Sequence, residues 1–169
     1  ISRYEQKQRG LPSGDNLKYR ICDVRDLDSL FRVCDEKIDI IYHLAALKCV
    51  DTIEDNPTES VKTNILGTQN VFDFAKMHEA KIVFTSTDKA CYPINAYGQS
   101  KAVAEKIIMQ NPKHAVLRYG NVLGSRGSIL SPLIKSLQND GKAYLTHAKM
   151  TRFWMPQEQV RDFILACGD

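Results

Sequence analysis

The stretch "KIVFTSTDKACYPINAYGQSKAVAEKII", residues 81–108, decides the fold. It opens with a run of apolar and small hydroxyl residues whose length is typical of a strand buried on both faces. It closes with apolar residues at helical spacing. An acid and a base, Asp88 and Lys89, lie between the two patterns, and Tyr97 and Lys101 follow four residues apart. We therefore predict a buried strand, a short connection and a helix, with four proton-carrying side chains at the junction.

Runs of the same kind recur at residues 17–21, 38–46 and 114–119. Helical patterns fill residues 26–36 and 61–79 between them. Strands that alternate with helices of this length indicate right-handed βαβ crossovers. The sequence therefore predicts an α/β fold with a doubly wound, Rossmann-like parallel sheet.

The pattern becomes less regular after about residue 128. We expect a helix there, then a short strand at residues 143–145 and a loop at residues 149–154. A further helix is expected from about residue 157. This change in character separates residues 1–127 from residues 128–169.

The composition is that of an ordinary globular domain, with 169 residues, 43% hydrophobic and 25% charged. The formal charge of +3 is too small, and the basic residues too scattered, to indicate a nucleic-acid partner. Five scattered cysteines without a Cys-x-x-Cys pair argue against a disulfide framework or a metal site. Neither a signal peptide nor a run of about 18 apolar residues is present, so we expect a cytoplasmic protein without a membrane partner.

Polar and small residues follow each predicted strand. They are Asp23, residues 45–48, residues 85–89 and residues 120–126. The carboxyl ends of parallel strands meet at one edge of the sheet, where such folds bind their ligands. The sequence therefore predicts a ligand site at this edge.

The Tyr97–Lys101 pair is a weak indication when taken alone, because this spacing also occurs on surface helices. On a helix the two side chains share a face. An ammonium group near a phenol favours phenolate and lowers the pKa of the tyrosine, which makes it a usable base. The position of the pair, directly after a buried strand that ends in "TST", favours this catalytic interpretation.

Several stretches together resemble a known family: "HLAALK", "STDKACYPINAYGQSKAVAE", "RYGNVLGSRGS" and "MTRFW". They are similar to the soluble UDP-N-acetylglucosamine 4,6-dehydratases of the extended short-chain dehydrogenase/reductase family, the inverting enzymes above all. The resemblance covers nearly the whole chain. It implies an NADP-dependent nucleotide-sugar dehydratase of bacterial surface polysaccharide biosynthesis, with UDP-N-acetylglucosamine as substrate and a homo-oligomeric assembly.

The resemblance gives each residue of the junction a catalytic role. Tyr97 takes the proton of the sugar 4-hydroxyl, and Thr87 hydrogen-bonds that hydroxyl. Lys101 holds the cofactor ribose and tunes Tyr97. Lys89 removes the C5 proton, and Asp88 protonates the departing 6-hydroxyl. Adjacent opposite charges after a strand are otherwise commonly an exposed turn.

The resemblance also implies the binding residues. Those for the cofactor are Ser2, Arg3, Lys7, Asp23, Val24, Leu44, Ala45, Ala46, Lys48, Tyr97 and Lys101. Those for the substrate are Lys48, Thr87, Asn121, Ser125, Arg126 and Arg152. Two cations and a hydroxyl at the start of the chain suit the 2′-phosphate of NADP. Asp23 would accept from the adenine amino group with Val24 beside the ring, although it could instead be a helix N-terminal carboxylate.

One departure from the family concerns the cofactor fold. No strand followed by Gly-x-Gly-x-x-Gly and a helix is present, and the glycines at 120, 124 and 127 belong to the substrate-side loop. We therefore expect the N-terminal βαβ unit to be missing. Residues 1–127 would form a partial NADP-binding domain with the catalytic residues, and residues 128–169 the start of a truncated substrate-binding region. The isolated chain is expected to bind NADP poorly and to be inactive.

Two rival functions remain open at this point. A nucleotide-sugar 4-epimerase or reductase of the same family shares Tyr97 and Lys101, but it has no use for the Asp88–Lys89 pair. A non-catalytic NADP-binding or scaffold fragment is the second alternative, because the glycine loop is absent. His43 receives no catalytic role.

Overall fold

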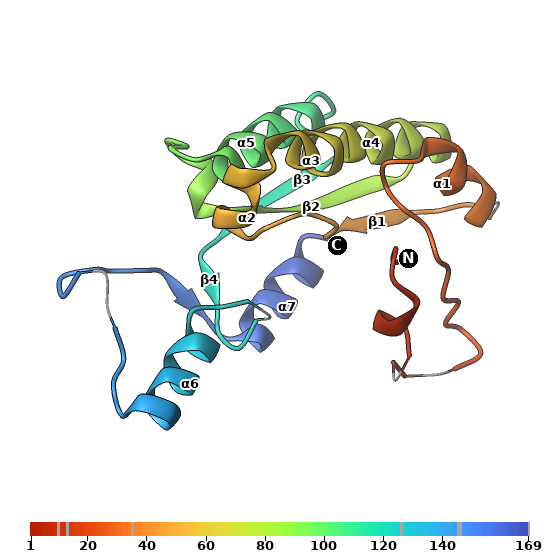
Figure 1. The fold of residues 1–169 in the computed structure, drawn as a ribbon. Coiled ribbons are helices and arrows are strands. Elements are labelled where there is room, and N and C mark those ends of the chain that lie inside the picture. The colour runs from red at the N-terminus through yellow and green to blue at the C-terminus, as the bar shows by residue number, and fades with distance from the viewer. Residues whose placement is uncertain (10, 13, 35, 126, 145–146, 169) are drawn as a thin grey trace.

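The computed structural model describes residues 1–9, 11–12, 14–34, 36–125, 127–144 and 147–168. Figure 1 shows a parallel sheet with helices on both of its faces. The helices are η1 (Glu5–Lys7), α1 (Leu27–Val33), α2 (Val50–Asp55), α3 (Pro57–Ser60), η2 (Val61–Leu66), α4 (Gly67–His78), η3 (Asp88–Ala90), α5 (Ala96–Ile108), α6 (Leu130–Asp140) and α7 (Gln157–Ala166). The strands are β1 (Ile40–His43), β2 (Lys81–Thr87), β3 (Ala115–Tyr119), β4 (Asn121–Val122) and β5 (Trp154–Met155).

Among the described residues, the main sheet has the order β1-β2-β3, and both of its strand pairs are parallel. The register aligns Ile41 with Ile82, and Phe84 with Val116. Strands β4 and β5 form a second, two-stranded parallel sheet. The predicted α/β fold with a parallel sheet is confirmed, and residues 81–87 form the predicted buried strand.

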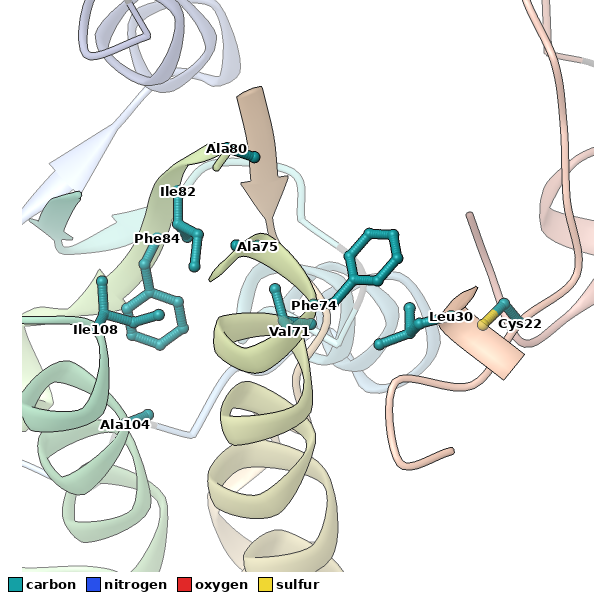
Figure 2. Packing of buried hydrophobic residues seen from close by; sticks show 10 residues of the cluster. All are labelled: Cys22, Leu30, Val71, Phe74, Ala75, Ala80, Ile82, Phe84, Ala104 and Ile108. Atoms are coloured by element: carbon teal, nitrogen blue, oxygen red, sulfur yellow. The ribbon is translucent and has the colours of Figure 1, made fainter. Parts of the chain in front are cut away.

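Alternate side chains of β2 enter two separate cores. Ile82 and Phe84 pack with residues of α4 and α5 on one face, and Figure 2 shows these side chains together. Val83 and Leu117 pack with Val160 and Ile164 of α7 on the other face. Because successive side chains of a strand point to opposite faces, β2 needs apolar residues in sequence rather than in alternation. Burial on both faces is what makes its sequence continuously apolar.

Local signals set several helix ends. Asn95 caps α5 by accepting a hydrogen bond from the backbone N–H of Gly98 at 2.8 Å. Helix α4 ends at Glu79, which adopts the left-handed conformation with φ of 55°. Helix α6 ends in the same way at Gly141, with φ of 64°.

Between α3 and α4, the η2 segment has π-helical hydrogen bonding, a feature often found at functional sites.

Two predicted strands are wrong. In residues 17–21 only Ile21 pairs, through a single parallel bridge with Ser2. Leu17 and Ile21 are exposed, because β1 pairs only with β2 among the described residues and offers this segment no ladder. In residues 143–145, Ala143 and Tyr144 are not in a strand, and position 145 lies outside the described residues. The strand in this part of the chain is instead β5. Its first residue, Trp154, is the last residue of the predicted loop, and Met155 follows the loop.

Candidate active site

The predicted catalytic residues lie where β2 ends and α5 begins. Thr87 is the last residue of β2, Asp88 and Lys89 open η3, and Tyr97 and Lys101 lie near the start of α5. All of these except Asp88 line a cleft of about 1370 Å³. The cleft lies at the carboxyl ends of the parallel strands, where open α/β sheets bind ligands.

Gly98 lets the start of α5 pack directly on η3. A Cβ atom at position 98 would collide with the carbonyl oxygen of Lys89 and would also crowd Pro93. Only glycine lacks a Cβ, so it alone permits this close approach. The packing fixes Tyr97, the neighbour of Gly98 in the chain, relative to the charged residues of η3.

A network of hydrogen bonds joins the acid, the base and the tyrosine. Thr87 Oγ1 donates to Asp88 Oδ1 at 3.0 Å and shares another hydrogen bond with Tyr97. Lys89 Nζ donates to Asp88 Oδ1 at 3.0 Å and to Asn121 Oδ1 at 3.1 Å. The side chains of Lys89 and Asp88 are 31% and 28% exposed, so each has room to meet a ligand. The arrangement can exchange a proton between a carboxylate and an amine beside a phenol.

The phenol of Tyr97 differs from the expectation. Burial raises its pKa above 10, and the hydrogen bond with Thr87 offsets this only in part. Tyr119 and the carboxylate of Asp88 raise the pKa further, the latter because a negative charge disfavours phenolate. The expectation that Lys101 lowers the pKa of Tyr97 is wrong for this structure, in which Tyr97 is a neutral phenol at pH 7.

The direction of the Lys101 side chain explains the difference. Lys101 is 3% exposed, its Nζ donates to the carbonyl oxygen of Thr85 at 2.6 Å, and Nζ lies 3.9 Å from the centroid of the Phe84 ring. Burial lowers the pKa of Lys101 from 10.5 to about 7, and the negative charge of Glu105 acts in the opposite direction. The amine is therefore directed at β2 and is only partly charged at neutral pH.

His43, to which we assign no catalytic role, is a packed residue at the end of β1. Its ring centroid lies 5.4 Å from that of Phe84, and its Nε2 lies 3.0 Å from Thr68 Oγ1. Burial lowers the pKa of His43 to about 3, and the charge of Lys101 contributes to this decrease. The imidazole is therefore neutral at physiological pH.

The residues predicted to hold the substrate come together in the same cleft. Lys48, Thr87, Asn121, Ser125 and Arg152 all line it. Lys48 Nζ donates to Ser125 Oγ at 3.5 Å, which joins the loop after β1 to the loop after β4. Arg152 is exposed, so its guanidinium remains accessible although one nitrogen donates to the carbonyl oxygen of Thr151. Arg126 lies outside the described residues.

A second cavity, of about 590 Å³, collects most of the residues predicted to bind the cofactor. They are Ser2, Arg3, Asp23, Val24, Leu44, Ala45 and Ala46. The side chain of Lys7 lies outside the described part of the chain. Lys48, Tyr97 and Lys101, the other predicted cofactor residues, line the main cleft.

Asp23 is surrounded by cations in this second cavity. Arg25 Nε donates to Asp23 Oδ2 at 3.0 Å, and Arg3 Nη1 lies 3.5 Å from the same oxygen. Burial would raise the pKa of Asp23, but the hydrogen bonds from Arg25 and the two guanidinium charges hold that pKa below its usual value. The alternative of a helix N-terminal carboxylate is wrong, because Asp26 caps α1 by accepting from the backbone N–H of Ser29.

The two cavities meet along the loop that follows β1. Leu44 and Ala46 line both of them, and the loop is exposed at residues 44–46. A dinucleotide is an extended ligand that needs a path free of large side chains between its two rings. The arrangement, with Arg3 in one cavity and Tyr97 in the other, therefore fits a nicotinamide dinucleotide.

Asn64 is a buried residue that sequence reasoning missed. Its Oδ1 accepts from the backbone N–H of Leu47 at 2.8 Å, and its Nδ2 donates to Leu47 O and to Ser100 Oγ, each at 3.0 Å. Asn64 thereby fixes the loop after β1 to α5. Ser60, Asn64 and Thr68 recur at four-residue spacing, and all three are buried. This polar row in an otherwise amphipathic helix is the signal that could have identified it.

Glu105 was missed as well. It is buried and accepts hydrogen bonds from Ser86 Oγ and from the guanidinium of Arg118. It follows Tyr97 and Lys101 at the same four-residue spacing, so the three side chains share one face of α5.

Some features are absent from the part of the chain that the structure describes. No described helix is both long and apolar enough to cross a membrane. No group of three or more His, Cys, Asp or Glu side chains there could hold a metal ion.

A family model described as "Polysaccharide biosynthesis protein" matches residues 2–169. The chain belongs to the polysaccharide biosynthesis protein family. One relative is an uncharacterized membrane protein of Methanocaldococcus jannaschii, 41% identical over 92% of this chain and 49% of the relative. An inverting UDP-N-acetylglucosamine 4,6-dehydratase of Campylobacter jejuni is 40% identical over 98% of this chain and 53% of the relative. A UDP-glucose 4-epimerase of Rickettsia bellii is 39% identical over 98% and 52%.

This member of the polysaccharide biosynthesis protein family thus spans about half the length of the curated relatives it matches. The solved structure of Pen from Bacillus thuringiensis superposes with a TM-score of 0.88 at 35% identity, over 98% of this chain and 55% of that one. A dTDP-glucose 4,6-dehydratase from Streptomyces venezuelae, solved with NAD and TYD bound, has a TM-score of 0.79 over 92% and 56%. At 21% identity the latter shows the fold alone, which is Rossmann-like.

Proposed function

We propose that the chain carries the catalytic residues of a nucleotide-sugar 4,6-dehydratase that acts on UDP-N-acetylglucosamine, uses NADP and inverts C5. The observation that carries the proposal is the hydrogen-bonded set of Thr87, Asp88, Lys89 and Asn121 next to Tyr97. Oxidation at one carbon needs one proton carrier, whereas loss of water needs an additional base and acid. The site has all three, and the Campylobacter relative bears the name of this reaction.

The first step is removal of the 4-hydroxyl proton by Tyr97, with Thr87 holding the same hydroxyl. Because burial makes Tyr97 a neutral phenol in this structure, the phenol must first lose its own proton to act as this base. A nicotinamide cofactor, when bound, supplies a hydride acceptor for C4 and afterwards a hydride donor for C6. The resulting 4-ketone acidifies the neighbouring C5 hydrogen.

The second step uses the Asp88–Lys89 pair. Transfer of one proton along their 3.0 Å hydrogen bond converts carboxylate and ammonium into carboxylic acid and amine. The amine of Lys89 then takes the C5 proton, and the electron pair left behind forms the C5–C6 double bond as the C6–O bond breaks. Asp88 gives its proton to the departing hydroxyl, which leaves as water. Return of a proton to the opposite face of C5 inverts that carbon.

The cofactor would lie across both cavities. Ser2, Arg3 and Lys7 would meet the 2′-phosphate, which is the basis for proposing NADP rather than NAD. Asp23 and Val24 would hold the adenine, and Lys101 the ribose beside the nicotinamide. The small residues after β1 would let the nicotinamide side approach the backbone. This arrangement is supported by the position of Arg3 in the second cavity, although it is paired with Asp23 here.

The sugar and its diphosphate would occupy the rest of the main cleft. Lys48 and Ser125, already in contact, would hold the nucleotide sugar together with Asn121. Arg126, which lies outside the described residues, would join them. Arg152 would bind the diphosphate, because a guanidinium matches paired phosphate oxygens.

A 4-epimerase is the second candidate, because the Rickettsia relative bears that name and is nearly as similar to the chain as the dehydratase. An epimerase moves hydride to and from C4 and eliminates nothing. It would use Tyr97 and Lys101 and leave Asp88 and Lys89 as a surface ion pair.

Replacing Lys89 with alanine separates the two functions. The experiment uses the complete enzyme, meaning a polypeptide that carries this chain together with a glycine-rich cofactor loop. We expect Lys89→Ala to retain C4 oxidation, seen as NADPH absorbance, and to lose the 6-deoxy product and solvent deuterium exchange at C5. Tyr97→Phe should abolish the NADPH signal itself. Each loss should be about 10²- to 10⁴-fold.

The matched control is Lys106→Ala, at an exposed lysine of α5. It should leave both readouts unchanged. Near-normal dehydration and C5 exchange in Lys89→Ala would contradict the dehydratase proposal and favour the epimerase.

A further inference from the structure

Helix α5 presents a row of three titratable side chains to the sheet. Tyr97, Lys101 and Glu105 recur at four-residue spacing, which places them on one face of the helix. Lys101 and Glu105 are each only 3% exposed. A buried charge is costly unless a partner compensates it. Each member of this oppositely charged pair therefore favours the charged form of the other. The proposed mechanism uses Tyr97 and Lys101 and gives Glu105 no part.

Three hydrogen bonds fix the carboxylate of Glu105. Ser86 Oγ and Arg118 Nε donate to Oε1, the latter at 2.8 Å, and Arg118 Nη2 donates to Oε2. Ser86 of β2 and Arg118 of β3 are direct partners in the sheet register, so Glu105 bridges the two strands at one level. Its side chain is 4% exposed and that of Arg118 is 48% exposed. The carboxylate is therefore inside the protein, and the cation that neutralises it lies largely at the surface.

Several titratable side chains lie on α5 and on the elements packed round Lys101. They include Asp88 and Lys89 on η3, His43 on β1, Tyr97 and Glu105 on α5, and Arg118 and Tyr119 on β3. Burial lowers the pKa of His43 and raises the pKa values of both tyrosines, so these three are neutral at pH 7. Among the described residues, Glu105 is the group whose charge raises the pKa of Lys101 against the effect of burial.

We propose that Glu105 is a positioning residue that acts through Lys101: its clamped carboxylate supplies the negative charge that favours the ammonium form of the buried amine. Arg118 moderates this effect, because its guanidinium competes for the same carboxylate. The kinetic consequence rests on the proposed function, in which the ammonium group of Lys101 holds the cofactor ribose. The electrostatic part is a property of the chain itself.

A purely structural clamp would make different predictions. If Glu105 only held α5 against β2 and β3, loss of either Glu105 or Arg118 would break the same contacts and have similar effects. If its charge acts on Lys101, the two losses have opposite signs. Glu105→Gln removes the anion and should lower the pKa of Lys101. Arg118→Met removes a cation and frees the carboxylate, so it should raise that pKa.

The first measurement is an NMR titration of the chain with ¹³Cε-labelled lysine, in which Lys101→Met assigns the resonance. We expect the midpoint of Lys101 to move down in Glu105→Gln and up in Arg118→Met. Arg118 is about half exposed, so its variant is expected to fold even if Glu105→Gln does not. An unchanged midpoint in Arg118→Met, or a change in the same direction in both variants, would overturn the proposal.

The second measurement is the pH profile of kcat for the complete enzyme. The alkaline limb, where Lys101 loses its proton, should move to lower pH in Glu105→Gln, with about tenfold less activity on that limb for each pH unit by which it moves. Activity at the acid end should approach that of the unaltered enzyme. A uniform loss at every pH would mean a structural role and contradict the proposal. If the NMR midpoints move as expected but dehydration is not observed, the electrostatic inference stands and the proposed function fails.

Discussion

Replacing Lys101 with methionine should make the folded protein more stable at neutral pH. Methionine is unbranched and similar in length, so it can fill the space of the lysine stem between α5 and the Phe84 ring. What the substitution removes is an amine that is 3% exposed and whose pKa burial lowers from 10.5 to about 7. The lowered pKa means that the fold disfavours the charged amine.

The size of the gain follows from the two pKa values. Below pH 10.5 the unfolded chain binds a proton that the folded chain accepts only near pH 7. Stability linked to Lys101 is therefore present above pH 10.5 and is lost progressively as the pH falls from 10.5 to about 7. At about 1.4 kcal/mol per pH unit, the cost is about 4 kcal/mol at pH 7 and about 2 kcal/mol at pH 9. The hydrogen bond to Thr85 O returns about 1 kcal/mol, which leaves a net gain for the variant of about 3 kcal/mol at pH 7.

The assay is urea denaturation followed by circular dichroism at pH 7, 9 and 10.5. We expect the advantage of Lys101→Met to shrink at each step and to vanish or reverse at pH 10.5. Lys106→Met, at an exposed position of the same helix, is the control and should change stability little at any pH. A destabilised Lys101→Met variant at pH 7, or a gain that does not depend on pH, would refute the reasoning. The gain should be accompanied by loss of activity, as is common where stability is sacrificed to function.

Three further perturbations test other parts of the structure. Arg3→Ala should narrow the preference of the complete enzyme for NADP over NAD, and equal binding of both cofactors by the unaltered enzyme would contradict the assignment of Arg3. Gly98→Ala should destabilise the protein by about 1–3 kcal/mol, because its Cβ would meet the carbonyl oxygen of Lys89; an unchanged melting temperature would show that η3 and α5 are not tightly packed. The lowered pKa of His43, about 3, means that stability present above pH 6.5 is lost as the pH falls towards 3, by about 2 kcal/mol at pH 5. His43→Leu should flatten this slope in denaturation curves.

The sequence was sufficient to predict the central strand, because a strand that is buried on both faces has a continuous run of apolar residues. Residues 81–87 are apolar without alternation, and they form the predicted strand. Residues 17–21 are also rich in apolar residues but do not form a strand, since a strand depends on a neighbour as well as on its own residues. Propensity describes one segment, whereas a ladder needs two.

The candidate site likewise has features that the sequence predicts and features that it does not. Spacing placed Tyr97 and Lys101 on one helix face, and strand ends placed Asn121 near Lys89, where the structure has a 3.1 Å hydrogen bond. The direction of the Lys101 amine and the raised pKa of Tyr97 depend on burial by residues distant in the chain. Asn64 binds backbone atoms of another loop, and its mark in the sequence is only the row of polar residues at four-residue spacing.

Strand β2 limits how proteins built on this scaffold can diverge. Ile82, Val83 and Phe84 are buried in one of two cores, so a substitution at these positions disturbs packing before it alters any chemistry. Asp88 and Lys89 follow immediately, with about 30% of each side chain exposed. Substitutions of these two residues change the charges beside the cleft without changing the packing of the sheet. The reaction of such a protein can therefore change through substitutions at the end of β2, while the apolar residues of the strand stay the same.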